Sequence, residues 1–226
     1  SVVVIIPALN EAATIGGLVA AARSYADWVV VADNGSSDGT AGAARAAGAE
    51  VVTDPRRGYG YACAAGTAQA LELGADVLVY MDGDGSARPE ELPRLLEPLS
   101  TDEADLVLGS RVLGGAEPGA LAPHQRFGNA LSAALMRRLY GIAVTDLGPY
   151  RAIRAGLLRD LDMREMTYGW PTEMTVKAAR RGARVVEVPV TWANRRAGRS
   201  KVSGTVRGSV LAAVYILGVT LRYARR

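Results

Sequence analysis

The sequence predicts an α/β fold in which a mostly parallel sheet carries helices on both faces. Apolar, strand-like runs alternate with helix-like stretches through the first half of the chain, the pattern of repeated strand–helix–strand units. With 226 residues, 49% of them hydrophobic, the chain can build one well-packed core. Ligands of such folds bind outside the carboxyl ends of the strands, so we expect a binding site where four polar turns follow strands, at residues 7–11, 33–38, 56–60 and 82–86.

The first strand is expected at residues 1–6, where the run VVVII suits a buried parallel strand. We expect it to break at Pro7 and to be followed by an amphipathic helix. Asn10 is placed to cap that helix, and Glu11 and Thr14 fall in its first turn. The backbone N–H groups of the helix start would then face a ligand beyond the strand.

Two further strands follow in the same manner. The run WVVVA at residues 28–32 predicts the second strand, with a polar turn at residues 33–39 and a helix from about Thr40. A short third strand at residues 50–53 leads through a glycine-punctuated loop and a helix, residues 54–74, to the fourth strand.

The fourth strand, VLVYM at residues 77–81, runs directly into Asp82-Gly83-Asp84. Two carboxylates separated by one residue can offer oxygen ligands to one Mg²⁺ or Mn²⁺, and Gly83 and Gly85 leave room for water and a diphosphate. Aspartate and glycine are also what an ordinary tight turn requires. The position after a buried strand, beside the upstream polar turns, favours the metal site.

The second half continues the alternation. A strand at residues 106–110 would deliver Arg111 to the same edge, where a guanidinium suits phosphate oxygens but is also an ordinary surface charge. Residues 114–123 contain three glycines and two prolines and are expected to form a mobile loop over the site. A helix should then occupy about residues 125–140.

Two more candidates follow that helix. A turn at residues 146–151 presents Asp146 and Arg151, and a further helix begins at about Pro171 with Glu173 in its first turn. The helix dipole alone favours a glutamate there, so its position is not by itself evidence of a site.

Seven motifs make the chain resemble a family 2 glycosyltransferase of the GT-A fold, nearest to the polyprenyl-phosphate mannose and glucose synthases. The resemblance covers nearly the whole chain. The motifs are PALNEA at 7–12, DNGSSDGT at 33–40, RGYGYA at 57–62, MDGDGS at 81–86, GSR at 109–111, DLGPYRAI at 146–153 and GRSKVSGT at 198–205.

The resemblance implies a donor site. The first two motifs would hold the nucleotide base and ribose, and Asp82 and Asp84 would hold Mg²⁺ or Mn²⁺ on the donor diphosphate. The position that often supplies a third metal ligand in this family is Ser86, a shorter side chain that leaves more water on the ion. The implied donor-binding residues are Pro7, Ala8, Asn10, Glu11, Asp33, Arg57, Gly58, Asp82 and Gly83.

The resemblance also implies catalytic and acceptor residues. Candidates for catalysis are Asp84, Asp146, Glu173 and Arg111. In GT-A transferases the helix start near Glu173 commonly carries an acid that faces the acceptor. Candidates for binding an acceptor phosphate are Arg151, Arg199, Ser200 and Lys201.

The expected activity is metal-dependent, inverting transfer of a hexose from a nucleotide sugar to an acceptor, with polyprenyl phosphate as the favoured acceptor. UDP-glucose and GDP-mannose both fit as donors, and we favour UDP slightly. A phosphate oxygen is largely ionised near neutral pH and needs little help from a base, whereas a soluble hydroxyl acceptor would need one, with Glu173 or Asp146 as candidates.

Two other classes share parts of this pattern. A sugar nucleotidyltransferase would be expected to carry a Gly-rich, Arg-containing loop after the first strand, and a NAD-binding oxidoreductase would carry G-x-G-x-x-G there. The chain has PALNEA at that place.

We expect one domain over residues 1–226, with a nucleotide-sugar half at 1–100 and an acceptor half with a C-terminal helix at 101–226. A net charge of +3 gives no nucleic-acid signature. The apolar run at residues 210–221 lies between two basic clusters and is shorter than the ~20 residues that span a bilayer. It fits either a helix docked on the domain or a helix lying at an anionic membrane surface.

The remaining features concern compartment and partners. A single cysteine, Cys63, and no visible signal peptide predict a cytoplasmic protein, at the inner face of the membrane if the acceptor is a lipid. His124 has no partner at metal-ligand spacing. Nothing in the sequence indicates an oligomeric state.

Overall fold

The computed structural model describes residues 1–195 and 206–224 of the chain. In this part of the chain the strands form one seven-stranded sheet in the order β3-β2-β1-β4-β6-β5-β7. The strands are β1 (Val2–Ala8), β2 (Trp28–Asp33), β3 (Glu50–Thr53), β4 (Val77–Tyr80), β5 (Leu106–Ser110), β6 (Arg151–Arg154) and β7 (Val185–Pro189).

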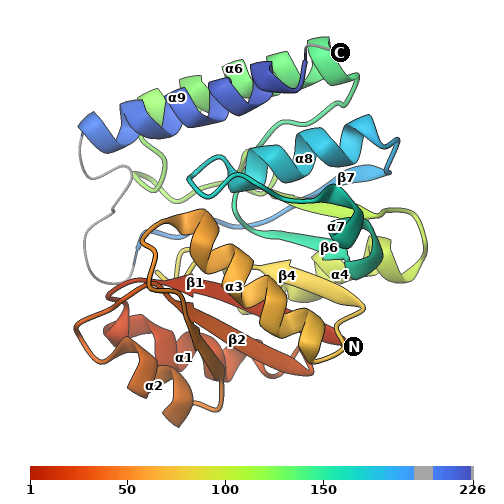
Figure 1. Cartoon of the computed structure of the whole chain (residues 1–226). Coiled ribbons are helices and arrows are strands. Elements are labelled where there is room, and N and C mark those ends of the chain that lie inside the picture. Colours follow the sequence, from red (N-terminus) through yellow and green to blue (C-terminus); the bar gives the residue numbers. More distant parts are fainter. Residues whose placement is uncertain (196–205, 225–226) are drawn as a thin grey trace.

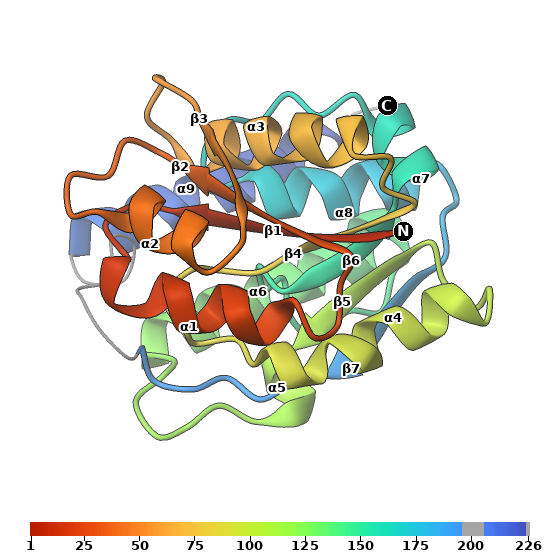
Figure 2. The same ribbon diagram turned by 90° about the horizontal axis from the view of Figure 1, so that it is seen from below.

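Helices cover both faces of this sheet (Figures 1 and 2). One core cluster joins the sheet to helices α1, α2 and α4, and a second cluster joins the other face to α3, α7 and α8. The helices α6 and α9 pack against each other and lie beyond α8, away from the sheet (Figure 1). The helix bounds are α1 (Ala12–Ala22), α2 (Thr40–Ala46), α3 (Tyr59–Glu72), α4 (Leu92–Ser100), α5 (Arg111–Gly114), α6 (Pro123–Tyr140), α7 (Ala155–Leu161), α8 (Trp170–Arg180) and α9 (Val206–Arg222).

The predicted mostly parallel sheet is confirmed, with one exception that the sequence pattern did not reveal. Strand β6 runs antiparallel to both of its neighbours, β4 and β5. We expected a turn at residues 146–151 that leads into the next element, and Arg151 is the first residue of β6. A strand of four residues is too short for its periodicity to stand out from a turn.

The sequence predicts that the first strand breaks at Pro7, but the strand continues through this residue. Strand β1 continues to Ala8 and pairs with β2 as far as Asp33. The odd-numbered residues of β1 bond toward β4, as in the hydrogen bond from the Met81 N–H to the Ile5 carbonyl. Because β4 ends at Tyr80, Pro7 faces a place where no ladder N–H is required.

Asn10 does not cap α1. Its backbone has a positive φ of 54°, and its side-chain oxygen accepts a hydrogen bond of 2.8 Å from the N–H of Ser37. The N–H of Ala12 at the helix start donates instead to Asp38 Oδ2, 3.1 Å away. The two polar loops after β1 and β2 are therefore tied to each other.

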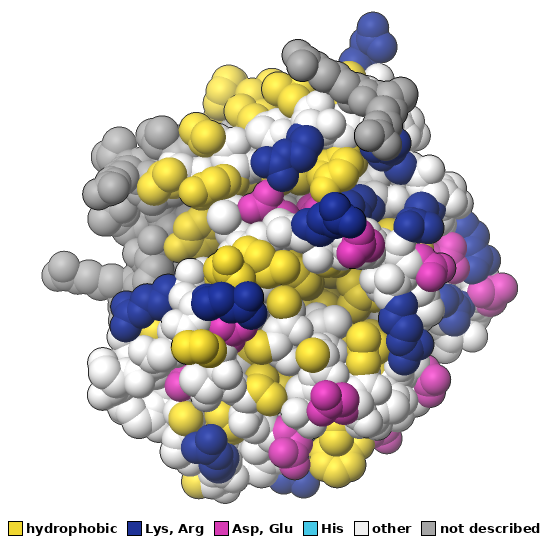
Figure 3. Space-filling model, viewed as in Figure 1, with side chains coloured by type: hydrophobic (Ala, Val, Ile, Leu, Met, Phe, Trp, Pro, Cys, Tyr) yellow, Lys and Arg dark blue, Asp and Glu magenta, His cyan; other side chains and the backbone are white. Residues whose placement is uncertain are grey.

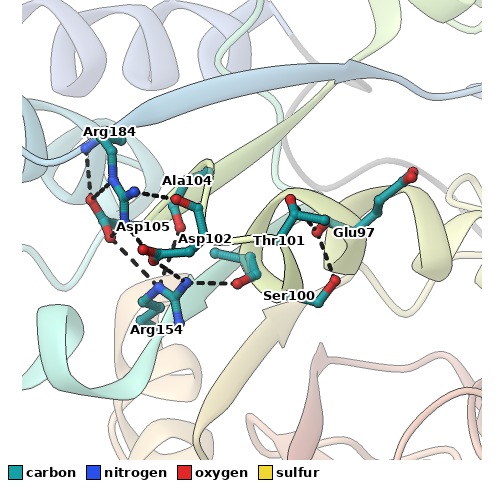
Figure 4. Close-up of polar contacts among 9 residues, drawn as sticks. Glu97, Ser100, Thr101, Asp102, Ala104, Asp105, Arg154 and Arg184 are labelled. Carbon is teal, nitrogen blue, oxygen red and sulfur yellow. Dashed lines mark hydrogen bonds and ion pairs between the residues drawn. The ribbon is translucent and has the colours of Figure 1, made fainter.

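A charged network holds the opposite edge of the sheet, away from the carboxyl ends of the parallel strands (Figure 4). Arg184, before β7, pairs with Asp105 at 2.7 Å and with Asp102 at 2.8 Å. Arg154, at the end of β6, also pairs with Asp102, at 3.0 Å. These contacts fix the amino ends of β5 and β7 against β6.

The helices in residues 1–195 and 206–224 all fall short of the length and apolar character that crossing a membrane would require.

Candidate active site

A cavity of about 1510 Å³ opens at the carboxyl ends of the parallel strands. Its floor comes from the ends of β1 and β4 and the loops that follow β2 and β5. Its other walls come from α6, α9 and the segment after β7. Of the candidates from the sequence, those lining it are Pro7, Ala8, Glu11, Arg57, Gly58, Asp82, Gly83, Asp84, Ser86 and Arg111.

The two aspartates after β4 lie together on the cavity wall. Oδ1 of Asp84 accepts a hydrogen bond of 2.9 Å from the N–H of Ser86, and Oδ1 of Asp82 accepts one of 3.3 Å from the Tyr59 hydroxyl. Burial, and then the negative charge of Asp84, raise the pKa of Asp82 to about 7, against the opposing effects of Tyr59, Arg111 and Arg195. A bound cation would relieve this repulsion between like charges.

The oxygen chemistry of this pair fits a hard divalent cation. Within the described residues, no cluster of three or more His, Cys, Asp or Glu side chains is arranged to hold a metal. Mg²⁺ and similar ions are often held by one or two carboxylates while substrate phosphates and water complete the shell. Asp82 and Asp84 could therefore hold an ion together with a diphosphate.

Arg195 is a site residue that the sequence analysis missed. Its Nη1 lies 2.8 Å from Glu11 Oε1 and its Nη2 lies 2.9 Å from Asp84 Oδ2. The N–H of Ala193 donates to the Ser86 carbonyl at 2.9 Å, which holds this segment against the aspartate loop. In the sequence Arg195 was one of several arginines near residue 200, and only its long-range contacts distinguish it.

Arg111 enters the cavity from the end of β5, held by Asp146. Nε and Nη2 of Arg111 each lie 2.7 Å from one carboxylate oxygen of Asp146, and the Arg111 N–H donates to the same group at 2.8 Å. The guanidinium carbon lies 5.2 Å from the centre of the Trp192 ring. Asp146 itself is fully buried and does not line the cavity.

The loop after β2 contributes Asn34 rather than Asp33 to the cavity. Oδ1 of Asp33 accepts hydrogen bonds from the N–H and the hydroxyl of Ser36. Asn34 donates to the Arg56 carbonyl and accepts from the Gly58 N–H, both at 2.8 Å. Asn34 thereby joins the second polar loop to the RGYGYA loop.

Glu173 lies away from the cavity and is occupied by other groups. Its carboxylate accepts hydrogen bonds from the Tyr223 hydroxyl at 2.6 Å and from the N–H groups of Arg164 and Glu165, and it pairs with Lys177 at 2.9 Å. Burial would raise the pKa of Glu173, but these partners together lower it. The expectation that Glu173 faces the acceptor does not match this placement.

Arg151 is also buried, with 1% of its surface exposed. Its guanidinium donates to the carbonyls of Pro171 and Gly148 and to the Thr175 hydroxyl. Burial lowers the pKa of Arg151 to about 10. Arg151 thus supports the loop before β6 and the start of α8, and a phosphate in the cavity cannot reach it directly.

The remaining phosphate candidates, Arg199, Ser200 and Lys201, lie outside the described residues. On the described wall of the cavity, α6 presents Arg126, which the sequence analysis did not single out. The signal available in the sequence was weak, because an arginine in the first turns of a helix is common.

Apolar side chains form the outer part of the cavity wall and continue onto the surface. Phe127 of α6 is 73% exposed, Val214 of α9 is 58% exposed and Val112 of α5 is 57% exposed. Of these, Val112 and Phe127 also line the cavity. The space-filling view shows hydrophobic side chains along the edge where α6 and α9 lie (Figure 3). We call these exposed residues the apolar rim: Val112, Leu113, Phe127, Leu131, Leu211 and Val214.

This sheet, with paired aspartates at the end of β4 and a large cavity beside them, is that of a glycosyltransferase of the GT-A class. The chain belongs to glycosyl transferase family 2, whose model matches residues 3–162. It is 38% identical over 238 residues to an undecaprenyl-phosphate mannosyltransferase of Micrococcus luteus, covering 98% of this chain and 96% of that protein. It is 34% identical to a polyprenol monophosphomannose synthase of Mycolicibacterium smegmatis, covering 89% of this chain and 81% of that protein.

A solved structure with the same fold is glucosyl-3-phosphoglycerate synthase of Mycobacterium tuberculosis in complex with Mn²⁺, UDP and glucosyl-3-phosphoglycerate. The TM-score is 0.78 with 23% identity, over 99% of this chain and 80% of that one. This similarity confirms the predicted GT-A fold.

Proposed function

We propose that this glycosyltransferase moves a hexose from a nucleotide sugar to a polyprenyl phosphate, with inversion at the anomeric carbon and with Mg²⁺ or Mn²⁺ on the donor. The observation that carries the acceptor assignment is which acidic side chains line the cavity. Within the described residues, the acidic side chains that line it are Glu11, Asp82 and Asp84, and Arg195 pairs with Glu11 and Asp84.

This set of acidic side chains favours an acceptor that needs no general base. A sugar hydroxyl must lose its proton during attack, but Asp146 is committed to Arg111 and Glu173 lies elsewhere. A phosphate monoester is already largely ionised near neutral pH. The names of the two relatives, which refer to undecaprenyl phosphate and to a polyprenol, support the same acceptor class.

The donor half, residues 1–100, would hold the nucleotide between the loops after β1 and β2. Pro7, Ala8, Asn34, Arg57 and Gly58 line that part of the cavity. Gly58 has a φ of 153°, and a Cβ there would come within 2.8 Å of the Met166 carbonyl, so only glycine fits. UDP is the favoured nucleotide of the donor, and the solved structure of similar fold that contains UDP is consistent with this choice.

Asp82 and Asp84 would hold the divalent ion, which supplies positive charge to the departing diphosphate when bound. Tyr59 orients Asp82 through its hydroxyl, and Ser86 orients Asp84 through its N–H. Arg195 adds a fixed cation beside them, which also favours a dianionic leaving group.

Residues 101–226 would form the acceptor half. Arg111 of α5 and Arg126 of α6 line the cavity and can bind phosphate oxygens, with Arg199, Ser200 and Lys201 as further candidates. Val112 and Phe127 of the apolar rim directly follow these arginines in the sequence and line the cavity with them. A polyprenyl phosphate needs this combination, a cationic clamp for its headgroup and an apolar surface for its chain.

We further propose that the apolar rim rests on the inner face of the membrane, where a lipid acceptor and a nucleotide-sugar donor can both be reached. The exposed side chains of α6 and α9 would enter the headgroup region while the sheet stays outside it. This surface would contact the membrane peripherally and would not cross it.

The proposal is tested with purified protein and labelled donors. UDP-glucose and GDP-mannose are each supplied with Mn²⁺ and with either a polyprenyl phosphate in detergent or soluble sugars and polyols. We expect transfer to the polyprenyl phosphate that stops in excess chelator. Transfer only to a soluble hydroxyl would overturn the acceptor assignment and leave the glycosyltransferase assignment intact.

A further inference from the structure

Glu187, in strand β7, has a carboxylate that is fully used by two consecutive residues of a neighbouring loop. Oε2 accepts hydrogen bonds from the N–H of Thr145 at 2.8 Å and from its hydroxyl at 2.9 Å. Oε1 accepts one from the N–H of Asp146 at 2.8 Å. Glu187 itself is anchored in the sheet opposite Leu108 of β5, so these bonds extend a rigid element into the loop.

The loop is clamped on both sides. The N–H of Leu147 donates to Asn129 Oδ1 of α6 at 3.1 Å, and Asn129 donates to the Thr145 carbonyl at 2.9 Å. The three N–H groups of residues 145–147 therefore all point to side chains from other elements. The carboxylate of Asp146, held on this loop, accepts three hydrogen bonds from Arg111.

Thr145, Leu147 and Asn129 also line the cavity, and Arg111 is the member of this chain of contacts that brings a charged group there. Asp146 binds its Nε and Nη2 edge, so the Nη1 end of the guanidinium points away from Asp146. The Trp192 ring, 5.2 Å from the guanidinium carbon, limits motion on one face. A guanidinium fixed in this way loses little side-chain entropy when it binds an oxyanion.

We propose that Glu187 is a positioning residue for glycosyl transfer, which acts through Asp146 to hold Arg111 toward the reacting phosphate. This inference rests on the proposed function, because it takes Arg111 to bind a phosphate group of the substrates. Glu187 does not line the cavity and makes no contact with a substrate there. Glu187 also bonds to Thr145, which lines the cavity, but Arg111 is the charged group that this loop holds there, so the effect of Glu187 on a phosphate should pass mainly through Arg111.

A double-mutant cycle tests this directly. Glu187→Gln replaces one acceptor oxygen by a donor, so the bonds to Thr145 and Asp146 cannot all form. We expect kcat/KM for a polyprenyl phosphate to fall about 10-fold in Glu187→Gln. A change of this size is typical of the coupling between groups in one hydrogen-bond network. In an Arg111→Ala background, Glu187→Gln should change kcat/KM by less than about 2-fold.

Asp105→Asn is the matched control. Asp105 also accepts a backbone N–H and a guanidinium between β5 and β7, but at the opposite edge of the sheet, with Arg184 (Figure 4). It should lower the melting temperature and leave kcat/KM, measured below that temperature, unchanged in both backgrounds. An effect of Glu187→Gln that is equal in the two backgrounds, while Arg111→Ala impairs transfer, would overturn the positioning role.

The proposed function fails in a different way. If Arg111→Ala transfers hexose to polyprenyl phosphate at the wild-type rate, Arg111 has no role in binding the phosphate, and the role of Glu187 falls with it. Unfolding in denaturant of the four proteins of the cycle, the wild type, the two single variants and the double variant, then shows whether Glu187 and Arg111 are coupled only as parts of the fold. Coupling of that kind alone would also count against a role in transfer.

Discussion

Arg195 and Asp84 form an ion pair of 2.9 Å at the carboxylate that the sequence predicts to bind a metal. The two residues are more than a hundred positions apart, and the guanidinium also bridges to Glu11 at 2.8 Å. The donor half and the segment after β7 therefore meet at two carboxylates, those of Asp84 and Glu11. A divalent ion and Arg195 would share the negative charge of this site.

Replacing Arg195 should separate metal binding from nucleotide binding. Arg195→Ala removes a cation that competes for Asp84, so the affinity for Mn²⁺ alone should rise by about 5-fold, while the affinity for UDP in the presence of Mn²⁺ should fall. Calorimetric titrations measure both. Arg159→Ala removes an equal charge from the exposed face of α7 and should change neither. Equal shifts in both variants would mean that only net charge matters.

Asp84→Ala should lower transfer by at least about 100-fold, because the charge that stabilises the departing diphosphate is lost. The circular dichroism spectrum should remain that of the wild type. Full wild-type turnover in excess chelator would contradict a metal-dependent reaction at this aspartate pair.

The affinity for Mn²⁺ should fall as the pH drops below about 7, because burial and the charge of Asp84 raise the pKa of Asp82 to about 7 and a metal ligand must be ionised. Titrations between about pH 8 and about pH 5.5 measure this. An affinity that does not change over this range would contradict the shifted pKa.

The stability of the protein in chelator should also depend on the protonation of Asp82. The folded-state pKa of Asp82 lies above its usual 3.8, so the folded protein binds more protons than the unfolded chain between these values. The contribution of Asp82 to stability is therefore lost as the pH rises from about 4 to about 7. Asp82→Asn should be more stable than the wild type near pH 8, and this advantage should shrink toward pH 4.

Glu173→Gln should impair folding rather than chemistry. Its carboxylate is fully buried and holds Tyr223, Lys177 and two backbone N–H groups, so the unfolding free energy should fall by about 2–3 kcal/mol. Well below the melting temperature, kcat should stay within about 2-fold of the wild type. A large loss of kcat in fully folded protein would restore Glu173 as a candidate base.

The apolar rim should control membrane binding. Phe127→Asp and Val214→Asp each place a charge where the proposal puts lipid, so binding to vesicles that contain anionic lipid should weaken by about 10-fold. Tyr25→Asp, at a partly exposed aromatic residue after α1, is the control and should bind as the wild type does. Cosedimentation distinguishes the variants, and equal binding by all three would exclude this surface.

The sequence by itself determined the alternating strands and helices and the polar turns at one edge of the sheet. These features depend on residues close together in the chain, such as the apolar run of β4 and the aspartates that follow it. The motifs also determined the family. Local pattern was sufficient here because a strand and its following turn are decided by period and composition within a few residues.

The tertiary structure decided which charged residues reach the cavity. Arg151 and Glu173 looked like site residues, but neighbouring elements bury and occupy both, whereas Arg195 and Arg126 line the cavity. The partners responsible are distant in sequence. Arg195 pairs with Glu11, 184 positions away, and Glu173 accepts a hydrogen bond from Tyr223, 50 positions away. A charged side chain carries no local signal of whether it will be paired, buried or exposed, because that depends on groups that only the fold brings within hydrogen-bond distance.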